Sequence, residues 1–243
     1  MKIIIIRHGD PDYEHDSLTP KGWREAEFLS EWVSCMDVDA VYVSPLGRAK
    51  DTAAASLKKL HQTATECEWL REFDAPIHRP DVTDRKKNTW DWLPQDWTKE
   101  PLFYDHERWT DHPVMTESDV KTQYDWVIQN FDALLASYGY VREDHFYRAE
   151  RANRDTIVFF CHFGLECVLL SRLLDTSPMV LWHHLCAAPS SVTTVVTEER
   201  REGIALFRMT GFGDISHLSV HGEKPSFQAR FCETFDDETE RHD

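Results

Sequence analysis

Histidine and arginine side chains follow two separate apolar segments of the chain. Arg7 and His8 come directly after the isoleucine run at residues 3–6, and His162 comes directly after the apolar residues 156–161. A histidine in such a position can act as a nucleophile, a base or a metal ligand. An adjacent arginine supplies a planar fork of donors that fits a phosphate or a carboxylate. These residue types favour chemistry on an anionic substrate.

A third segment adds a cation to the same region. Ser44 and Pro45 predict the cap and first turn of a helix, which places Arg48 near its N-terminus. If the strands before His8 and His162 are parallel neighbours, their carboxyl ends open at one edge of a sheet. Two guanidinium groups, two imidazoles and a helix N-terminus would then form an anion pocket, most naturally for a phosphoryl group.

Strand and helix signals alternate around these residues. Thr19 and Pro20 predict the start of a helix after the first strand, and residues 40–43 predict a second strand. Residues 192–197 and 204–209 predict two late strands that form a hairpin. This order predicts an α/β fold, a three-layer sandwich with a mostly parallel sheet and helices on both faces.

The middle of the chain breaks this alternation. Residues 67–73 alternate apolar and acidic side chains, which predicts a strand that runs into a loop. Residues 74–125 combine prolines, charges and tryptophans without a clear period, so we expect an inserted cap or lid over the site. Residues 233–243 are typical of a solvated acidic tail. We expect residues 1–243 to form one domain that contains this insertion.

Composition limits the class of partner. The chain has 243 residues, of which 41% are hydrophobic, enough for a sizeable core. Its formal net charge is −16, from 27 basic and 43 acidic residues, which disfavours binding to nucleic acid or to an anionic membrane. No stretch approaches the roughly 20 apolar residues of a membrane helix, and the isoleucine run is too short for a signal peptide. A small phosphate ester held by local cations fits this composition.

Six cysteines are scattered along the chain without a CxxC pair. In a chain of this size, that pattern favours reduced, mostly buried thiols and a cytoplasmic location. A zinc site built from Cys161, Cys167 and the His183-His184 pair would have spacings that match no known finger or ribbon. We therefore expect no metal site.

Five short motifs occur in order along residues 1–75 and 155–220. They are Arg7-His8-Gly9, Leu18-Thr19-Pro20-Lys21-Gly22, Ser44-Pro45-Leu46-Gly47-Arg48-Ala49, Leu70-Arg71-Glu72 and His162. This ordered set resembles the histidine phosphatase superfamily, which includes the cofactor-dependent phosphoglycerate mutases. Each motif is modest alone, and the order makes the resemblance specific. It implies that the nucleophile is His8, the phosphate clamp Arg7, Arg48 and His162, and the proton donor Glu72.

These implied roles agree with the physical chemistry of phosphoryl transfer. For attack, His8 must be neutral, with one ring N–H held by a backbone acceptor. The two arginines and a protonated His162 would neutralise charge on the phosphoryl oxygens. Glu72, or in its place Glu68 or Asp74, would protonate the leaving oxygen, a role that needs a raised pKa. The scheme requires no metal and no cofactor.

Several positions depart from the pattern of the family. Phe163 stands where many members carry glycine, and its ring would narrow the phosphate pocket although its backbone N–H can still donate. Asp10 replaces a small hydroxyl residue, and Glu14 stands where mutases carry asparagine. A carboxylate added near the pocket would weaken binding of multiply charged sugar phosphates. The tyrosine and glycine that follow the acid in mutases are also missing after Glu72. These departures favour a phosphatase over a mutase.

The sequence thus predicts hydrolysis of a phosphate monoester through a phosphohistidine on His8. Two alternatives stay open: a phosphomutase with the same intermediate, and a non-catalytic protein that binds a phospho-ligand on the same fold. His217 is either structural or part of a late family segment. The aromatic content of the insert favours an apolar or ring-bearing leaving group, whereas the identity of the substrate and the oligomeric state are not determined by the sequence.

Overall fold

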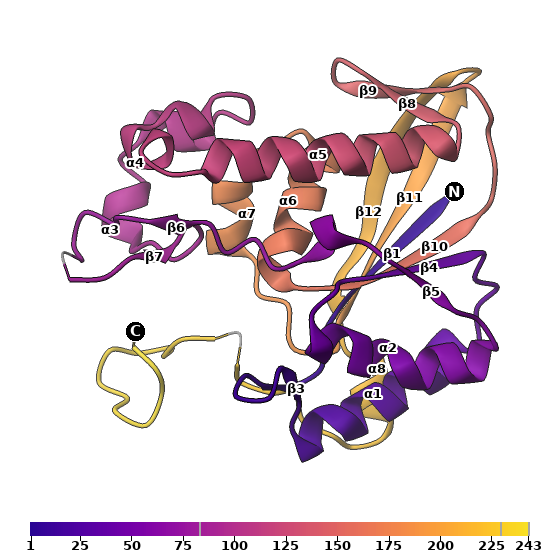
Figure 1. Ribbon diagram of the computed structural model, residues 1–243, viewed down its shortest axis with the longest axis horizontal. Coiled ribbons are helices and arrows are strands. Elements are labelled where there is room, and N and C mark those ends of the chain that lie inside the picture. The colour runs from indigo at the N-terminus through magenta and orange to yellow at the C-terminus, as the bar shows by residue number, and fades with distance from the viewer. Residues whose placement is uncertain (83, 229, 243) are drawn as a thin grey trace.

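The computed structural model describes residues 1–82, 84–228 and 230–242. Its centre is an eight-stranded sheet with helices on both faces (Figure 1). The strands, in spatial order, are β5 (Ala64–Glu66), β4 (Ala40–Val43), β10 (Thr156–Cys161), β1 (Lys2–Arg7), β11 (Val192–Arg201), β12 (Ile204–Asp214), β9 (Phe146–Ala149) and β8 (Tyr140–Glu143).

Most strands of this sheet point the same way. β5, β4, β10 and β1 pair in parallel, and β11, β12, β9 and β8 continue the sheet through antiparallel pairs. Because each antiparallel pair reverses direction, β12 and β8 run with β1, while β11 and β9 run against it. The predicted α/β sandwich with a mostly parallel sheet is confirmed, and the late hairpin is β11–β12.

The central strands contribute to two cores. In β1, Ile3 and Ile5 pack on one face of the sheet, and Ile4 and Ile6 pack on the other. Burial on both faces explains the uninterrupted isoleucine run. Helices cover both faces (Figure 1). The first face carries α5 (Val120–Ser137), α6 (Phe163–Leu174) and α7 (Pro178–His184), and the second carries α1 (Pro20–Val33), α2 (Gly47–Leu60) and α8 (Ser216–Val220).

Two helices on the second face begin in different ways. α1 begins as predicted, because the Thr19 hydroxyl accepts a hydrogen bond from the N–H of Gly22 at 3.1 Å. The Ser44 cap predicted for α2 is wrong, since the residue at the cap position is Leu46, whose side chain cannot accept a hydrogen bond. The Ser44 hydroxyl lies 2.8 Å from Nε2 of His162. Ser44 is therefore not the cap of α2, because its hydroxyl contacts the histidine that follows β10.

The strand predicted at residues 67–73 is also wrong. β5 ends at residue 66, and a 3-10 helix, η1 (Glu68–Leu70), follows. Trp69 and Leu70 are both buried. A strand would have placed these neighbours on opposite faces, because strand side chains alternate between faces. The 3-10 turn leads into the extended segment that carries Glu72.

Short elements extend past one end of the sheet between η1 and α5 (Figure 1). Tryptophans hold them together, with Trp92 packed against Phe103 at 5.1 Å between ring centroids and Trp109 against Trp182 at 5.5 Å. Residues 120–125, expected in the insert, belong to α5, and residue 83 lies outside the described residues. The elements are β6 (Pro76–Ile77), β7 (Lys87–Asn88), α3 (Pro94–Trp97), η2 (Pro101–Tyr104), η3 (Trp109–Asp111) and α4 (Pro113–Thr116).

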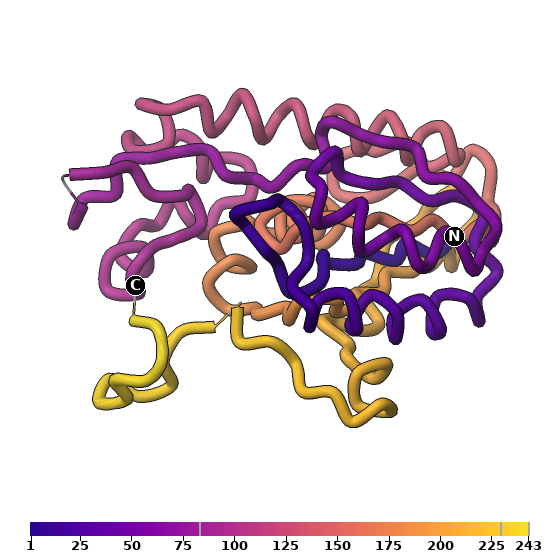
Figure 2. The backbone as a smooth tube through the Cα atoms, turned by 60° about the horizontal axis from the view of Figure 1, so that its bottom comes forward, coloured from indigo at the N-terminus to yellow at the C-terminus, as the bar shows by residue number. Residues whose placement is uncertain are grey.

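Two other segments lie outside the sheet. A small hairpin of β2 (Pro11–Asp12) and β3 (Ser17–Leu18) follows β1. Figure 2 shows the C-terminal segment leaving α8 and running toward the end of the molecule that carries the insert. Residue 243 of the expected acidic tail lies outside the described residues. Across the described ranges, none of the helices combines the length and the apolar character needed to cross a membrane.

Candidate active site

The two predicted histidines lie side by side because their strands are parallel neighbours. β1 and β10 pair with Arg7 opposite Cys161, so His8 and His162 follow at the same level of the sheet. The N–H of His8 donates to the Cys161 carbonyl at 2.9 Å. The imidazole centroids are 5.1 Å apart with an angle of 56° between the rings, and both side chains are buried. The predicted convergence of the two strand ends is observed.

Hydrogen bonding fixes the form of His8. Its Nδ1 lies 2.8 Å from the Gly9 carbonyl, which can only accept, so Nδ1 carries the proton and Nε2 has the lone pair. Burial, with the nearby guanidinium of Arg7, lowers the pKa of His8 well below its ordinary value. The ring is therefore neutral near pH 7, which is the state that a histidine nucleophile needs.

His217 supports the loop behind His8. The N–H of Ser190 donates to the His8 carbonyl at 3.0 Å, and the Ser190 hydroxyl lies 3.0 Å from Nε2 of His217. Ser190 has φ of +61°, a conformation that L-residues seldom adopt. Burial lowers the pKa of His217 to about 4. Of the two readings of His217 left open by the sequence, the contacts fit a residue that holds the backbone around His8.

The surroundings of His162 favour its neutral form. Its Nε2 lies 2.8 Å from the Ser44 hydroxyl, and its buried Nδ1 has no hydrogen-bond partner among the described residues. Burial, with a smaller contribution from His8, lowers the pKa of His162 well below its ordinary value. The protonated His162 expected from the sequence therefore depends on the charge of a bound phosphoryl group. A bound phosphate dianion would raise the pKa of His162, because an opposite charge favours the imidazolium.

Both predicted arginines are anchored at one end. Nη1 of Arg7 donates to the Ala187 carbonyl at 2.6 Å, and Nη1 of Arg48 donates to Oδ1 of Asp16 at 2.6 Å. Asp16 also accepts from the N–H of Gly47 at 2.7 Å, so it fixes Arg48 at the start of α2. The Nε atoms of both arginines are buried without a hydrogen-bond partner among the described residues. Each guanidinium thus keeps a donor for an anion.

Glu72 lies against the start of α6. Its Oε1 accepts from the N–H of Phe73 at 2.9 Å and of Leu165 at 3.0 Å. A Cβ built on Gly164 would lie 2.6 Å from this oxygen, so only glycine leaves room for the carboxylate. Desolvation raises the pKa of Glu72 even though these hydrogen bonds and Arg7 oppose the shift. A carboxyl group with a raised pKa suits proton donation.

The two alternatives to Glu72 lie in different places. Glu68 is exposed and its carboxylate is 3.7 Å from the guanidinium of Arg71, with which it forms a surface ion pair. Asp74 is exposed but lines the same cavity as Glu72. The geometry therefore favours Glu72 over Glu68 and keeps Asp74 near the site.

These residues meet at a cavity of about 750 Å³. Arg7, Arg48 and Glu72 line one part of it, and Phe163, the first residue of α6, lies beside them. The first N–H groups of a helix have no partner within the helix, so the start of α6 adds donors to the pocket. Aromatic residues of the insert and of α7 form another part of the lining, together with polar insert residues such as Asn88 and Asp91. The C-terminal segment contributes Gln228, Arg230, Phe231, Arg241 and His242.

The two extra carboxylates predicted near the pocket are those of Asp10, which is hydrogen-bonded to other residues, and Glu14, which is exposed. Oδ2 of Asp10 accepts from the Thr19 hydroxyl at 2.6 Å, and Oδ1 accepts from the Ser226 hydroxyl. Glu14 is exposed in the β2–β3 connection. The expectation that these carboxylates repel a substrate is therefore not supported for Asp10, because its charge is used to hold the start of α1.

Sequence reasoning missed one buried acid. Glu166, one turn after His162 in α6, is 1% exposed. Its Oε1 has no hydrogen-bond partner among the described residues. Desolvation raises the pKa of Glu166 to about 7. The only available signal was a charged residue inside an apolar helix, Leu165 to Leu173, which usually marks a solvent-facing position.

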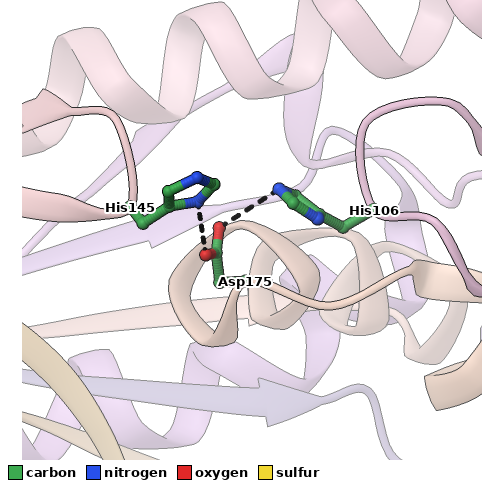
Figure 3. Close-up of side chains that lie close together, drawn as sticks. All are labelled: His106, His145 and Asp175. Atoms are coloured by element: carbon green, nitrogen blue, oxygen red, sulfur yellow. Dashed lines mark ion pairs between the residues drawn. The ribbon is translucent and has the colours of Figure 1, made fainter.

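A separate cluster joins His106 of the insert and His145 of the β8–β9 connection to Asp175 at the C-terminal end of α6 (Figure 3). Oδ2 of Asp175 lies 2.6 Å from Nδ1 of His145, and Oδ1 lies 3.5 Å from Nε2 of His106. Nη2 of Arg142 donates to the same carboxylate at 2.7 Å. These side chains line a second cavity of about 270 Å³. Although the three residues in Figure 3 are of metal-binding types, the Arg142 contact identifies the cluster as an ion-pair network.

Comparison with known proteins agrees with the geometry. The family model of the histidine phosphatase superfamily (branch 1) matches residues 3–132. A search of curated proteins gave no match. A phosphoserine phosphatase mutant from Entamoeba histolytica is similar in structure, with 19% identity and a TM-score of 0.59, over 89% of this chain and 98% of the other.

Two other solved structures show the same fold. The alpha-ribazole phosphatase from Shigella flexneri has 20% identity and a TM-score of 0.54, over 88% of this chain and 98% of its own. A mycobacterial glucosyl-3-phosphoglycerate phosphatase has 20% identity and a TM-score of 0.52, over 87% and 98%. At such identities, these likenesses establish the fold.

Proposed function

The chain belongs to the histidine phosphatase superfamily, and we propose that it hydrolyses a small phosphate monoester through a phosphohistidine formed on His8. One observation carries the proposal. The Gly9 carbonyl holds Nδ1–H of His8 at 2.8 Å, which leaves the lone pair on Nε2, and the ring lies 5.1 Å from that of His162 at a cavity lined by Arg7, Arg48 and Glu72. The phosphatase names of several solved structures with this fold support hydrolysis as the class of reaction.

In the first step, Nε2 of His8 attacks phosphorus. The P–N bond forms as the P–O bond to the leaving group breaks, and Glu72 gives its proton to the leaving oxygen. The unpaired Nε donors of Arg7 and Arg48 neutralise charge on the phosphoryl oxygens, and His162 adds a donor once the dianion raises its pKa. Positive charge comes from side chains of the protein, so the step needs no cofactor.

In the second step, water replaces the leaving group. Glu72, now ionised, takes a proton from the water as its oxygen attacks phosphorus, and the P–N bond to His8 breaks. Inorganic phosphate departs, His8 regains its neutral form and Glu72 regains its proton. The balance is one ester and one water consumed, with one alcohol and one phosphate produced.

A phosphatase fits this chain better than a phosphomutase. A mutase must hold a second phosphate of its substrate, whereas two insert cations, Arg79 and Lys87, pair with Asp91 in this structure. The reduced thiols and acidic composition support a cytoplasmic enzyme that acts on small molecules rather than on nucleic acid. A non-catalytic binder would have no use for both a free His8 Nε2 and a Glu72 with a raised pKa.

Steady-state kinetics with p-nitrophenyl phosphate in the presence of a chelator tests this function. We expect His8→Ala to lower kcat by about 10³ or more. His78→Ala, which changes an exposed histidine of the insert, should behave as wild type. Comparable turnover in His8→Ala and wild type, or activity that disappears with the chelator, would overturn the proposal.

A further inference from the structure

The structure points to the chemical class of the leaving group. Resting on the proposed function, we infer that the ester carries a flat apolar ring on its leaving group, bound against Trp90 and Phe163. The phosphate would occupy the arginine end of the cavity, and the ring would occupy its aromatic part.

Trp90 lies beside the carboxyl group that the leaving group must meet. A Cβ built on Gly164 would lie 2.6 Å from Oε1 of Glu72 and 2.8 Å from Nε1 of Trp90, so both groups contact the same face of Gly164. Glu72 is the proposed donor to the leaving oxygen. The carbon chain attached to that oxygen therefore leaves the reacting centre beside the Trp90 ring.

The aromatic wall offers ring surface instead of hydrogen-bond donors. The indole N–H of Trp90 donates to the Phe73 carbonyl at 2.7 Å, and that of Trp182 donates to the Gly164 carbonyl at 2.8 Å. The indole N–H of Trp92 is bound within its own segment at 2.9 Å. Hydroxyl groups placed against these rings would lose water without gaining a hydrogen bond from the indole N–H groups, which is costly, whereas an apolar ring has no such bond to lose.

Much of this wall is already in place without a ligand. Trp92 and Trp182 are 6% and 5% exposed, and Trp182 stacks on Phe73 at 5.6 Å between ring centroids. Trp90 and Phe163 are only half-buried and line the cavity, so they keep surface for a ligand. A wall that does not have to be ordered on binding retains more of the hydrophobic gain.

Cations near the aromatic part are engaged with other groups. Arg79 and Lys87 pair with Asp91, at 3.2 Å and 3.4 Å. In the C-terminal segment, the guanidinium of Arg241 lies over the Phe231 ring at 4.1 Å from its centroid. These contacts favour an uncharged leaving group over one with a second phosphate.

Two esters of primary alcohols test the inference, because their leaving groups are chemically alike. For wild type, we expect kcat/KM for 2-phenylethyl phosphate to exceed that for n-propyl phosphate by about 30- to 100-fold, from burial of the phenyl ring. Trp90→Leu should reduce that ratio about tenfold, and Phe163→Leu should reduce it in the same direction. Trp126→Leu, which changes an exposed tryptophan of α5, should leave the ratio unchanged.

A ratio near one in wild type would overturn the inference, as would a ratio that survives both substitutions at the wall. Inhibition of wild type by 2-phenylethylphosphonate and n-propylphosphonate gives the same comparison without a variant, and equal inhibition constants would also overturn it. Failure of the proposed function looks different: both esters would then be hydrolysed equally by wild type and His8→Ala, or by neither.

Discussion

The two neighbouring imidazoles of His8 and His162 are proposed to have different roles because their hydrogen bonds differ. The Nδ1–H of His8 donates a hydrogen bond to a backbone carbonyl, so Nε2 carries the lone pair that the proposed attack requires. His162 is held at Nε2 by the Ser44 hydroxyl and keeps Nδ1 unpaired within the described chain. At the residue scale, the proposed site thus combines a neutral His8 with two arginine donors and an acid with a raised pKa, Glu72.

Substitution of the proposed acid should change the pH profile as well as the rate. Glu72→Gln should lower kcat for an alkyl phosphate by about 10²- to 10⁴-fold, and by less for p-nitrophenyl phosphate, whose leaving group needs no proton. Because Glu72 must be protonated, the wild-type rate should fall as pH rises through its raised pKa, and the variant should lose that limb. Glu68→Gln is the matched control. An unchanged profile in Glu72→Gln would shift the role to Asp74.

At the scale of elements, the strands and helices predicted correctly from the sequence are those whose pattern has a single physical cause. Burial on both faces made β1 and β10 continuous apolar runs, and the Thr19 cap marked α1. The Ser44 cap failed because a tertiary partner, His162, takes the hydroxyl. The strand predicted at 67–73 was wrong because these residues form a 3-10 turn, which buries the adjacent residues Trp69 and Leu70 although the sequence alternates apolar and acidic side chains. The edge hairpin β8–β9 had no turn or composition signal strong enough to be recognised.

The candidate site followed the same rule. The residues placed by strand ends and by helix α2 could be identified from the sequence, since their positions depend on local order. Asp16, Glu166 and the aromatic lining could not, because their roles depend on packing between segments far apart in the chain. The lowered pKa of His162 could not be predicted from the sequence either, because it depends on how deeply the ring is buried in the folded protein.

The end of α6 gives a prediction about one element. Asp175 has φ of +57° and pairs with Arg142 and His145. Asp175→Ala loses the ion pairs and keeps a strained backbone, so we expect a loss of about 1–3 kcal/mol in the free energy of unfolding. Asp175→Gly loses the same pairs but relieves the backbone, and should recover about 1 kcal/mol of this. Urea denaturation measures both, and equal losses would show that strain plays no part.

At the scale of the whole molecule, two buried acids make stability depend on pH. Desolvation raises the pKa of Glu25 and of Glu166 to about 7 each. Between the ordinary pKa of 4.5 and about 7, the folded state holds more protons than the unfolded state, so the free energy of unfolding falls as pH rises. The fold is therefore most stable in mild acid with respect to these groups.

Glu166→Gln should remove one of these contributions, because glutamine cannot ionise. Relative to wild type, the variant should gain stability as pH rises from about 4.5 to 7, to at most about 3 kcal/mol, and differ little below about pH 4.5. Urea denaturation across this range checks the trend, and Glu68→Gln, at an exposed position, should parallel wild type. Parallel curves for Glu166→Gln and wild type would mean that Glu166 titrates as an ordinary carboxylate.

The covalent intermediate on His8 is the central claim, and intact-protein mass spectrometry after brief mixing with an aryl phosphate tests it most directly. We predict a transient gain of about 80 Da, the mass of one phosphoryl group, that is labile in acid and absent from His8→Ala. Phosphate release from wild type without any such adduct under rapid quench, or the same adduct in His8→Ala, would contradict the account.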